Sequence, residues 1–402
     1  MAKRRVICNE APQHALHVAS PNRRSVRPCM ARSCRRGEPD TLFHSDAVRP
    51  RGQQLSDLRP VNIQDVARAA GVAVSSVSRV LSNHPDVSKA MRSRILAVVE
   101  ELSYVPDPVA QSMRSGSTRT IGFVVRDFAN AFFGDIIHGV EETLTAAGYT
   151  LFVINSGGDP STEVKRIGLL RQRRVDALLL SSVSDRSADT RRAVDGFPRP
   201  VVLLDRDLGV RAAGNVRLDH AHGVRAAVDH LLGLGHKRIA MITGSADIRP
   251  TAERLRGLRE AYAAAELPVR EELLVTGAFS SEFAQGAATQ LLALSPTRRP
   301  TALLTGGLQS TIGVLEALSA LRVSAGEDLS LVVCDDVPWL RVLRPAISAV
   351  TRDAVGMGRA AGQLALDMIA GAAAETRTLS TEYVPRETTL PAVRRRAASQ
   401  RF

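Results

Sequence analysis

Apolar residues first recur with a helical period between residues 61 and 106. The first group lies at i, i+3, i+4 and i+7, one face of a helix, and consists of Ile63, Val66, Ala67 and Ala70. Gly71 then predicts a tight turn, residues 74–81 carry a second apolar stripe, and Ser88 can cap a third helix. Three short helices, the first two joined by a glycine turn, predict an all-α helix-turn-helix domain over residues 58–106.

From Thr120 onward, short apolar runs alternate with amphipathic stretches. The predicted strands are residues 121–125, 151–154, 177–180, 201–204, 239–243, 273–275, 302–304 and 329–333. The predicted helices include residues 136–147, 222–234, 252–265 and 311–321. Continuous apolar strands separated by helices imply parallel sheets that are covered on both faces. Because roughly 270 residues exceed one doubly wound sheet of ordinary size, we predict an α/β core of two interleaved lobes over residues 119–390.

Three further segments lack a regular apolar pattern. Residues 107–118 are a Ser- and Gly-containing hinge, too short to hold a helix by itself. Residues 391–402 are a predicted disordered tail. Residues 1–57 are rich in Arg, Pro and Ser and are predicted to be a disordered basic leader. Three interpretations of this leader stay open: an arm that adds phosphate contacts, a metal site, or a segment without function, which is either a solvated tail or the result of a translation start misassigned upstream of the real one.

The formal net charge of +12 is unevenly distributed. Residues 1–60 contain twelve Lys and Arg against five Asp and Glu, which places +7 in these first sixty residues. Residues 61–118 contain six basic and five acidic residues. Overall charge is therefore weak evidence for nucleic-acid binding, and the prediction depends on the geometry of the motifs.

Cysteine usage and hydropathy favour a cytoplasmic protein. No run of about 18 apolar residues predicts a membrane-spanning helix, and no apolar segment follows the basic start as an export signal requires. The four cysteines, Cys8, Cys29, Cys34 and Cys334, form no disulfide framework. A zinc site in the leader is disfavoured because Cys29-x4-Cys34 lacks a second ligand pair. We expect no metal, no cofactor and no membrane association.

No catalytic constellation is present in the sequence. The Gly157-Gly158 and Gly306-Gly307 pairs match neither dinucleotide-binding nor phosphate-loop spacing. No Gly-x-Ser-x-Gly segment occurs. His230 and His236 lie six residues apart around a helix end, where structural roles are expected. The sequence therefore predicts a protein that is not an enzyme.

An ordered series of motifs starts with Val61-Asn-Ile-Gln-Asp-Val-Ala-Arg-Ala-Ala-Gly71, Val72-Ala-Val-Ser-Ser-Val-Ser-Arg-Val-Leu-Ser-Asn83 and Ser103-Tyr-Val-Pro106. It continues through residues 109–122 and then Asp127-x2-Asn130-x-Phe132-Phe133, Asp205-Arg206, His230-Leu-Leu-x-Leu-Gly-His236-Lys-Arg-Ile-Ala240, Glu253-Arg254-x2-Gly257 and Cys334-Asp335-Asp336. This series resembles the LacI/GalR family of repressors, from the DNA-binding head through the hinge to the ligand-binding core. The resemblance covers roughly residues 61–390, and ordered motifs over that span are far more specific than a lone helix-turn-helix.

The resemblance places the second head helix in the major groove of DNA, with its early residues at base edges. Val74, Ser75 and Arg79 would then meet the bases, and Ser76 and Ser82 would lie nearer to phosphate. Arg79 can donate two hydrogen bonds to a guanine, which is worth about 1–3 kcal/mol of discrimination. Val74 can contact a thymine methyl group, and packing in the core of the head is the alternative for this side chain.

Three other positions bear on the same interface. By the resemblance, the hinge orders on DNA beside its dimer mate and inserts Met113 into the minor groove as an apolar wedge; the alternative is an exposed linker residue. Asn62 is assigned to the interface and is also the predicted N-cap of the first helix, with Asp65 completing a capping box. Ala73 stands where the family usually has a capping Ser or Thr, which should cost about 1 kcal/mol locally.

The resemblance also implies a small-molecule site between the two lobes, at the carboxyl ends of strands. The candidate effector-binding residues are Asp127, Asn130, Phe133, Asp205, Arg254, Gln309 and Asp335. Arg254 can clamp a hydroxyl pair or a carboxylate, and Asp335 can accept hydrogen bonds from sugar hydroxyls. Leu308 departs from the family, which commonly has Asp there to hold the effector. Because Leu308 has no carboxylate, three explanations stay open. The effector is not a typical sugar, Gln309 takes over the role of the missing Asp, or the protein no longer senses a small molecule. The single Trp339 is expected at the rim of the cleft or in an interface.

These observations predict a homodimeric repressor that binds double-stranded operator DNA and responds to a small, sugar-like effector. Three competing functions are retained. A solute-binding protein of a transporter would share the core but have an export signal and no head. An enzyme that processes sugars or nucleotides would need a catalytic constellation. A DNA-binding regulator could instead respond to a protein partner or to no effector, and Leu308 keeps this alternative open.

Overall fold

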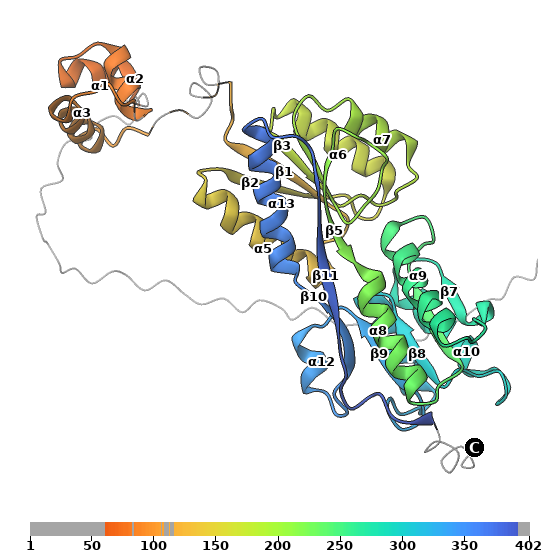
Figure 1. Cartoon of the computed structure of the whole chain (residues 1–402). Coiled ribbons are helices and arrows are strands. Elements are labelled where there is room, and N and C mark those ends of the chain that lie inside the picture. The colour runs from red at the N-terminus through yellow and green to blue at the C-terminus, as the bar shows by residue number, and fades with distance from the viewer. Residues whose placement is uncertain (1–60, 83, 106, 108–111, 113–115, 393–402) are drawn as a thin grey trace, which may run out of the picture. The chain divides into compact units, whose positions relative to one another are not determined.

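The computed structural model describes residues 61–82, 84–105, 107, 112 and 116–392. The first of these residues form a three-helix head with α1 (Ile63–Ala70), α2 (Val74–Leu81) and α3 (Lys89–Glu101) (Figure 1). The head closes over a small apolar core made of Val66, Ala67, Ala70, Val77, Val80 and Ile95. The predicted leader (residues 1–57), Met113 and nearly all of the predicted tail lie outside the described residues.

Local hydrogen bonds set the ends of the head helices. The Asn62 Oδ1 atom accepts hydrogen bonds from the backbone N–H groups of Gln64 (2.9 Å) and Asp65 (3.2 Å), and the Asp65 carboxylate accepts from the Asn62 N–H (3.1 Å). This is the predicted capping box. Gly71 ends α1 with φ of +62°, a left-handed conformation that glycine adopts without strain. Ala73, as predicted, provides no side-chain cap for α2.

Residues 119–392 are built on eleven strands in the order β2-β1-β3-β4-β5-β11-β10-β9-β8-β6-β7. The first half holds β1 (Thr120–Val125), β2 (Thr150–Asn155), β3 (Ala177–Leu180), β4 (Val201–Leu204) and β5 (Gly214–Asp219). The second half holds β6 (Ile239–Thr243), β7 (Leu274–Thr276), β8 (Ala302–Thr305), β9 (Ser330–Cys334) and β10 (Ser348–Arg352). Within each half, neighbouring strands are parallel.

The strand β11 (Thr376–Val384) connects the two halves. Its first part pairs in parallel with β5, and its second part pairs antiparallel with β10. In Figure 1, blue β11 runs beside green β5 and on to β10. The predicted parallel sheets are thus confirmed within each half, with one antiparallel pairing where the halves meet.

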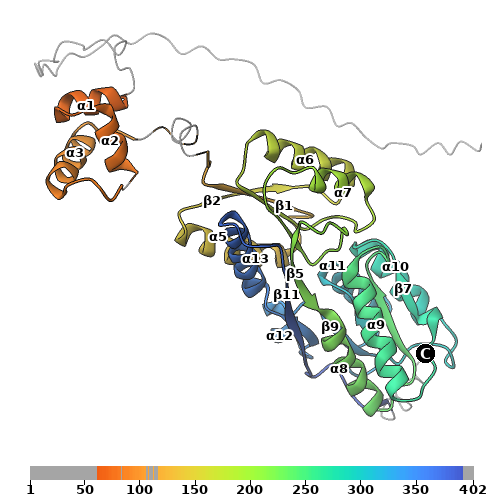
Figure 2. The ribbon, with the colours of Figure 1, turned by 45° about the horizontal axis from the view of Figure 1, so that its top comes forward.

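Helices cover both faces of each half-sheet (Figure 2). In the first lobe, α5 (Ala131–Ala146) and α13 (Ala354–Ile369) pack on one face, and α6 (Pro160–Gln172) and α7 (Ala188–Asp195) on the other. In the second lobe, α8 (His220–Gly233) and α9 (Arg249–Ala264) pack on one face, and α10 (Ser281–Leu292) and α11 (Leu308–Ala320) on the other. The short α12 (Pro338–Val342) follows β9, and the 3-10 turn η1 (Glu271–Leu273) precedes β7. The two-lobed α/β fold is confirmed.

Glycines allow α5 and α13 to pack backbone against backbone. A Cβ atom on Gly139 would overlap the carbonyl oxygen of Val355, and one on Gly358 would overlap the carbonyl oxygen of Ile136. The two helices therefore approach closely through reciprocal glycine contacts, and residues more than 200 positions apart in the chain form one layer of the first lobe. None of the described helices is long and apolar enough to cross a membrane.

Candidate functional site

The exposed face of α2 carries most of the residues predicted to contact DNA. Ser75 and Arg79 are exposed and Ser76 is half-buried, whereas Val77 and Val80 on the opposite face are buried. Val74 is 39% exposed, so it lies outside the core of the head and is accessible to a partner.

Two other predicted interface residues are engaged within the head. The Ser82 hydroxyl donates to the Arg79 carbonyl (3.2 Å), and the Asn62 oxygen is used in the capping box. Their side chains therefore stabilise helix ends. Met113 lies outside the described residues.

A cavity lies where the carboxyl ends of strands from the two lobes meet. It has a volume of about 50 Å³ and is lined by Asn130, Phe133 and Asp205 of the first lobe and Arg254, Gln309 and Asp335 of the second. Six of the seven predicted effector residues are therefore brought together. Asp127 does not line the cavity, because its carboxylate instead accepts a hydrogen bond from the Ala129 N–H (2.9 Å) in the loop before α5.

Several residues that line the cavity were not predicted from the sequence. They are mainly cationic or aromatic: Arg126, Arg206, Arg352, Phe132 and Phe279. Arg126 follows β1, Arg206 follows β4, and Arg352 ends β10. The position of each of these arginines at the carboxyl end of a strand was the available signal, but β10 was not predicted as a strand.

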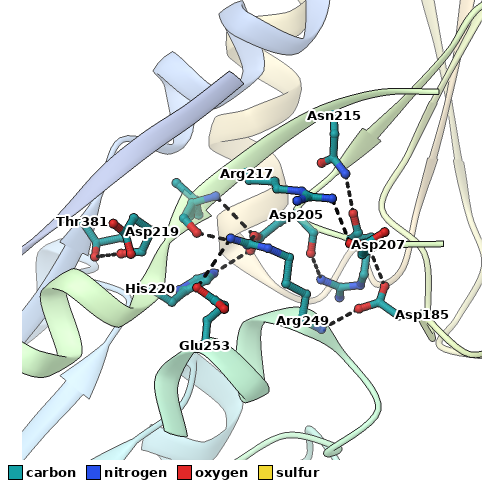
Figure 3. Close-up of polar contacts among 12 residues, drawn as sticks. Asp185, Asp205, Asp207, Asn215, Arg217, Asp219, His220, Arg249, Glu253 and Thr381 are labelled. Atoms are coloured by element: carbon teal, nitrogen blue, oxygen red, sulfur yellow. Dashed lines mark hydrogen bonds and ion pairs between the residues drawn. The ribbon is translucent and has the colours of Figure 1, made fainter. Parts of the chain in front are cut away.

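Asp205 is the centre of a buried polar network between the lobes (Figure 3). Its carboxylate accepts hydrogen bonds from His220 Nε2 (2.6 Å), Arg249 Nη1 (2.8 Å) and the Leu218 N–H (3.3 Å). Burial opposes ionisation, but the contact with His220 and the charges of Arg206 and Arg249 outweigh it and hold the pKa of Asp205 well below its usual range. Asp205 is therefore ionised at neutral pH.

Arg249 carries this network across the lobe boundary. It stands at the first residue of α9 in the second lobe, and its backbone N–H donates to Asp185 of the first lobe while its guanidinium holds Asp205. Ser184 of the first lobe donates to Asp247 of the second (2.7 Å). The Asp205–Arg249 contact and its neighbours therefore hold the lobes together on one side of the cavity.

A second acidic centre lines the same cavity. Asp335 follows β9 with φ of +87°, accepts from the Leu308 N–H (3.3 Å) and forms an ion pair with Arg352. Leu308 itself is buried and opens α11 after Gly307. The backbone of Leu308 thus contacts an acidic residue from another strand, although its side chain offers no polar group.

The buried His220 gives this site a pH dependence. Burial lowers the pKa of His220 to about 4, and its contact with Asp205 only partly offsets this. In the unfolded chain the pKa is about 6.5, so between pH 4 and pH 6.5 the unfolded state binds more protons and stability rises with pH. We expect the free energy of unfolding to be about 2 kcal/mol lower at pH 5 than at pH 7 because of this residue.

Denaturant titrations at the two pH values test this expectation. In the His220→Gln variant the difference between pH 5 and pH 7 should shrink by about 2 kcal/mol relative to the unmodified chain. The His222→Gln variant, which changes an exposed histidine on the same helix, should keep the difference. An unchanged pH dependence in the His220→Gln variant would contradict the assignment.

The other residues considered for chemistry have structural surroundings. His236 contacts Thr301 Oγ1 (2.9 Å) and the Leu390 carbonyl (2.9 Å), and His230 packs against the ring of Tyr383. No group of three or more His, Cys, Asp or Glu side chains with metal-binding geometry occurs in the described part of the chain. Trp339 does not line the cavity; it lies on the surface beside α11, 38% exposed.

Comparisons with known proteins agree with this architecture. Residues 62–107 match the family described as bacterial regulatory proteins, lacI family, and residues 228–389 match a periplasmic binding protein-like domain. The chain is 31% identical to the ribose operon repressor of Escherichia coli (strain K12), and 30% identical to the HTH-type transcriptional repressor PurR of Aliivibrio fischeri (strain MJ11). Each alignment spans 308 residues, 76% of this chain and 91% of the relative.

Solved structures show the same fold. The transcriptional regulator CelR in complex with cellobiose superposes with a TM-score of 0.63 at 29% identity, over 82% of this chain and all of that one. The lac repressor dimer bound to operator and an anti-inducer gives a TM-score of 0.73 at 24% identity, over 83% of this chain and all of that one. The matched relatives are repressors, and neither matching family description is that of a catalytic domain.

Proposed function

This chain belongs to the lacI family of bacterial regulatory proteins, and on that premise we propose that it represses transcription by binding an operator as a homodimer. The operator is read by α2, and its affinity is set by a small molecule bound between the lobes. The observation that carries this proposal is the presence in one chain of a helix-turn-helix head and a two-lobed core whose cavity gathers polar residues from both lobes.

The three parts divide this work. We assign DNA binding to residues 58–106, the link to residues 107–118, and effector binding and dimerisation to residues 119–390. The link is anchored to the first lobe through Asp176, which accepts hydrogen bonds from the backbone N–H groups of Thr118 (3.1 Å) and Arg119 (2.8 Å). A movement of the first lobe relative to the second would therefore move the end of the link that adjoins the core, which couples the effector to DNA affinity.

Contact with DNA is assigned to one face of α2. Ser75, Ser76 and Arg79 point away from the core of the head, and Val74 is exposed beside them. The first turn of α2 contains no acidic residue, so its backbone amides can approach phosphate. Arg79 has the geometry to read a guanine in the major groove by two hydrogen bonds.

Removal of the Arg79 side chain should weaken and relax operator recognition. We expect the Arg79→Ala variant to bind a duplex selected from random sequences with a Kd about 5- to 150-fold higher, which corresponds to 1–3 kcal/mol for one bidentate contact. Preference at one base pair of each half-site should be lost. The measurement is selection followed by titration of matched and single-base-changed duplexes.

The Arg94→Ala variant is the matched control, since it removes the same charge from an exposed position on α3. Its affinity should change little and equally for all duplexes. If the Arg79→Ala variant also loses affinity equally for all sequences, Arg79 contacts phosphate and the base-reading role is wrong. If no duplex is selected by the unmodified chain, the repressor function itself is wrong.

The alternatives make different predictions. A catalytic role is not proposed, because the buried Glu163 and Cys334 are held in structural surroundings: Glu163 accepts from Ser182 and Thr190, and burial raises the pKa of the Cys334 thiol. A solute-binding protein would bind ligand without binding DNA. A regulator that responds to a protein would bind operator with an affinity that no small molecule changes.

A further inference from the structure

The cavity between the lobes is unusually rich in guanidinium groups. Four arginines line it, namely Arg126, Arg206, Arg254 and Arg352. Only two carboxylates line the same cavity, Asp205 and Asp335. Four positive charges against two negative charges leave the lining with a surplus of two positive charges. His220 does not add to this surplus, because burial lowers its pKa to about 4.

Both lining carboxylates already have cationic partners. Asp205 is held by Arg249 (2.8 Å), which does not line the cavity, and by His220 (2.6 Å). Asp335 is paired with Arg352 and also accepts from the Leu308 N–H. Few acceptors therefore remain for the hydroxyl groups of a neutral sugar. The departure noted in the sequence, Leu308 where the family commonly has Asp, removes a further acceptor.

Several guanidinium nitrogens, in contrast, have no hydrogen-bond partner. The Nε and Nη1 atoms of Arg254, a residue only 3% exposed, are buried with no hydrogen-bond acceptor, and so are the Nε atoms of Arg126 and Arg352. Arg206 differs, because it donates to the carbonyl groups of Ser182 (2.6 Å) and Asp205 (2.8 Å). A buried cation without an acceptor is costly, and clusters of such groups are typical of functional sites.

Aromatic rings hold two of these guanidinium groups in the wall of the cavity. Arg126 lies over the ring of Phe279, with 4.8 Å from Cζ to the ring centroid, and Arg352 lies over Phe132 at 3.3 Å. Burial and the charge of Arg206 lower the pKa of Arg126 to about 10, so it keeps its charge at neutral pH while its neighbours repel it. The nearby Asp127 does not line the cavity.

We propose that the effector is a small anion whose carboxylate or phosphate group is bound by Arg254 together with Arg126 and Arg352. A doubly charged group would balance the surplus of the lining, and its oxygens would supply the acceptors that the buried guanidinium nitrogens lack. Since the cavity of about 50 Å³ is smaller than the roughly 300–1,000 Å³ of ordinary ligand pockets, the arginines swing from their rings or the lobes part as the anion enters. This inference names the effector class within the proposed function and therefore rests on it.

Matched pairs of neutral and charged compounds test the inference on the full chain. The probes are D-ribose against D-ribose 5-phosphate, and D-glucose against D-glucose 6-phosphate and D-gluconate, at constant ionic strength. Binding is measured as a shift of the melting temperature and by titration calorimetry, both without DNA. We expect one or more charged members to stabilise the chain while their neutral counterparts do not. Binding of D-gluconate alone indicates a carboxylate site, and binding of the sugar phosphates alone indicates a phosphate site.

Variants of two arginines link such binding to the cavity. Arg126→Met and Arg352→Met should each raise the Kd for the bound anion about tenfold or more, because truncating one partner of a desolvated charge pair is strongly unfavourable. Arg126→Met removes a guanidinium that burial and the charge of Arg206 both disfavour, so this variant should melt at or above the temperature of the unmodified chain. Arg352→Met leaves the buried Asp335 without its ion-pair partner, so this variant should melt at a lower temperature. Arg192→Met, at an exposed position on α7, is the control and should change neither property.

Each outcome decides the inference. Binding of neutral sugars with equal or higher affinity than their charged counterparts overturns it, as does a set in which no anion binds. An anion that binds equally well to the Arg126→Met and Arg352→Met variants also overturns it. Selection of an operator by a chain that fails these tests leaves the repressor function intact, whereas anion binding by a chain that selects no operator supports the inference and contradicts the repressor function.

Discussion

The Asp205→Asn variant should unfold with about 3 kcal/mol less free energy than the unmodified chain at pH 7. The substitution keeps the size of the side chain, and asparagine tolerates the positive φ of +55° at this position. It removes the charge that Arg249 and His220 share, and the loss of one partner from a buried pair costs about 3–5 kcal/mol. Denaturant unfolding measures the change.

Asp207→Asn is the matched control for this prediction. It removes a carboxylate two residues away that is 52% exposed and pairs with Arg217 at 3.0 Å. Exposed pairs are typically worth about 0–1 kcal/mol, so the effect should be small. Combining Asp205→Asn with Arg249→Met should cost less than the sum of the single changes, because the two side chains interact directly. An additive result would show that the lobes are not held by this pair.

The Gly139→Ala variant should destabilise the first lobe by about 2–3 kcal/mol, the upper part of the range for overpacking. The added Cβ would meet the carbonyl oxygen of Val355 on α13, and backbone atoms cannot rotate away as a side chain can. The helices must separate instead, which loosens the layer that α5 and α13 form against the sheet. The measurement is thermal and denaturant unfolding of the full chain.

A second glycine on α5 provides the control. A Cβ atom on Gly134 would meet nothing within 4 Å. Alanine has a higher helix propensity than glycine by about 0.8–1.0 kcal/mol, so Gly134→Ala should stabilise the chain slightly. If the free energy of unfolding falls for Gly139→Ala and rises for Gly134→Ala, the effect of helix packing is distinguished from the effect of helix propensity. A stabilising Gly139→Ala substitution would contradict the close contact between the helices.

Prediction from the sequence was most successful where a segment is determined by its own residues. The strands β3, β4 and β6 have the bounds expected from their apolar runs. The capping box of α1 and the turn at Gly71 also depend only on nearby residues. These features involve contacts across a few positions, so the local pattern contains the information that determines them.

The strands that connect the lobes were not predicted. In β11 exposure alternates along the strand, and Arg, Ser, Thr and Glu occupy many of its positions, so it lacks a continuous apolar run. It is a strand because β5 supplies partners on one side and β10 on the other. β5 and β10 likewise contain polar residues at their ends, where they approach the cavity. The pairing of β5 with β11 joins segments more than 150 residues apart in the chain.

For this protein, the sequence alone determined the head, the two-lobed α/β class and six of the residues that line the cavity, because helix periods, caps and strand ends are local signals. Only the tertiary structure decided which charged side chains lie next to one another in the cavity. Arg126 and Arg352 lie more than 200 residues apart, and His220 reaches Asp205 from another element. A side chain's charge can be read from its position in the chain, but its partners and burial depend on how distant segments pack, and these decide whether the cavity favours an anion.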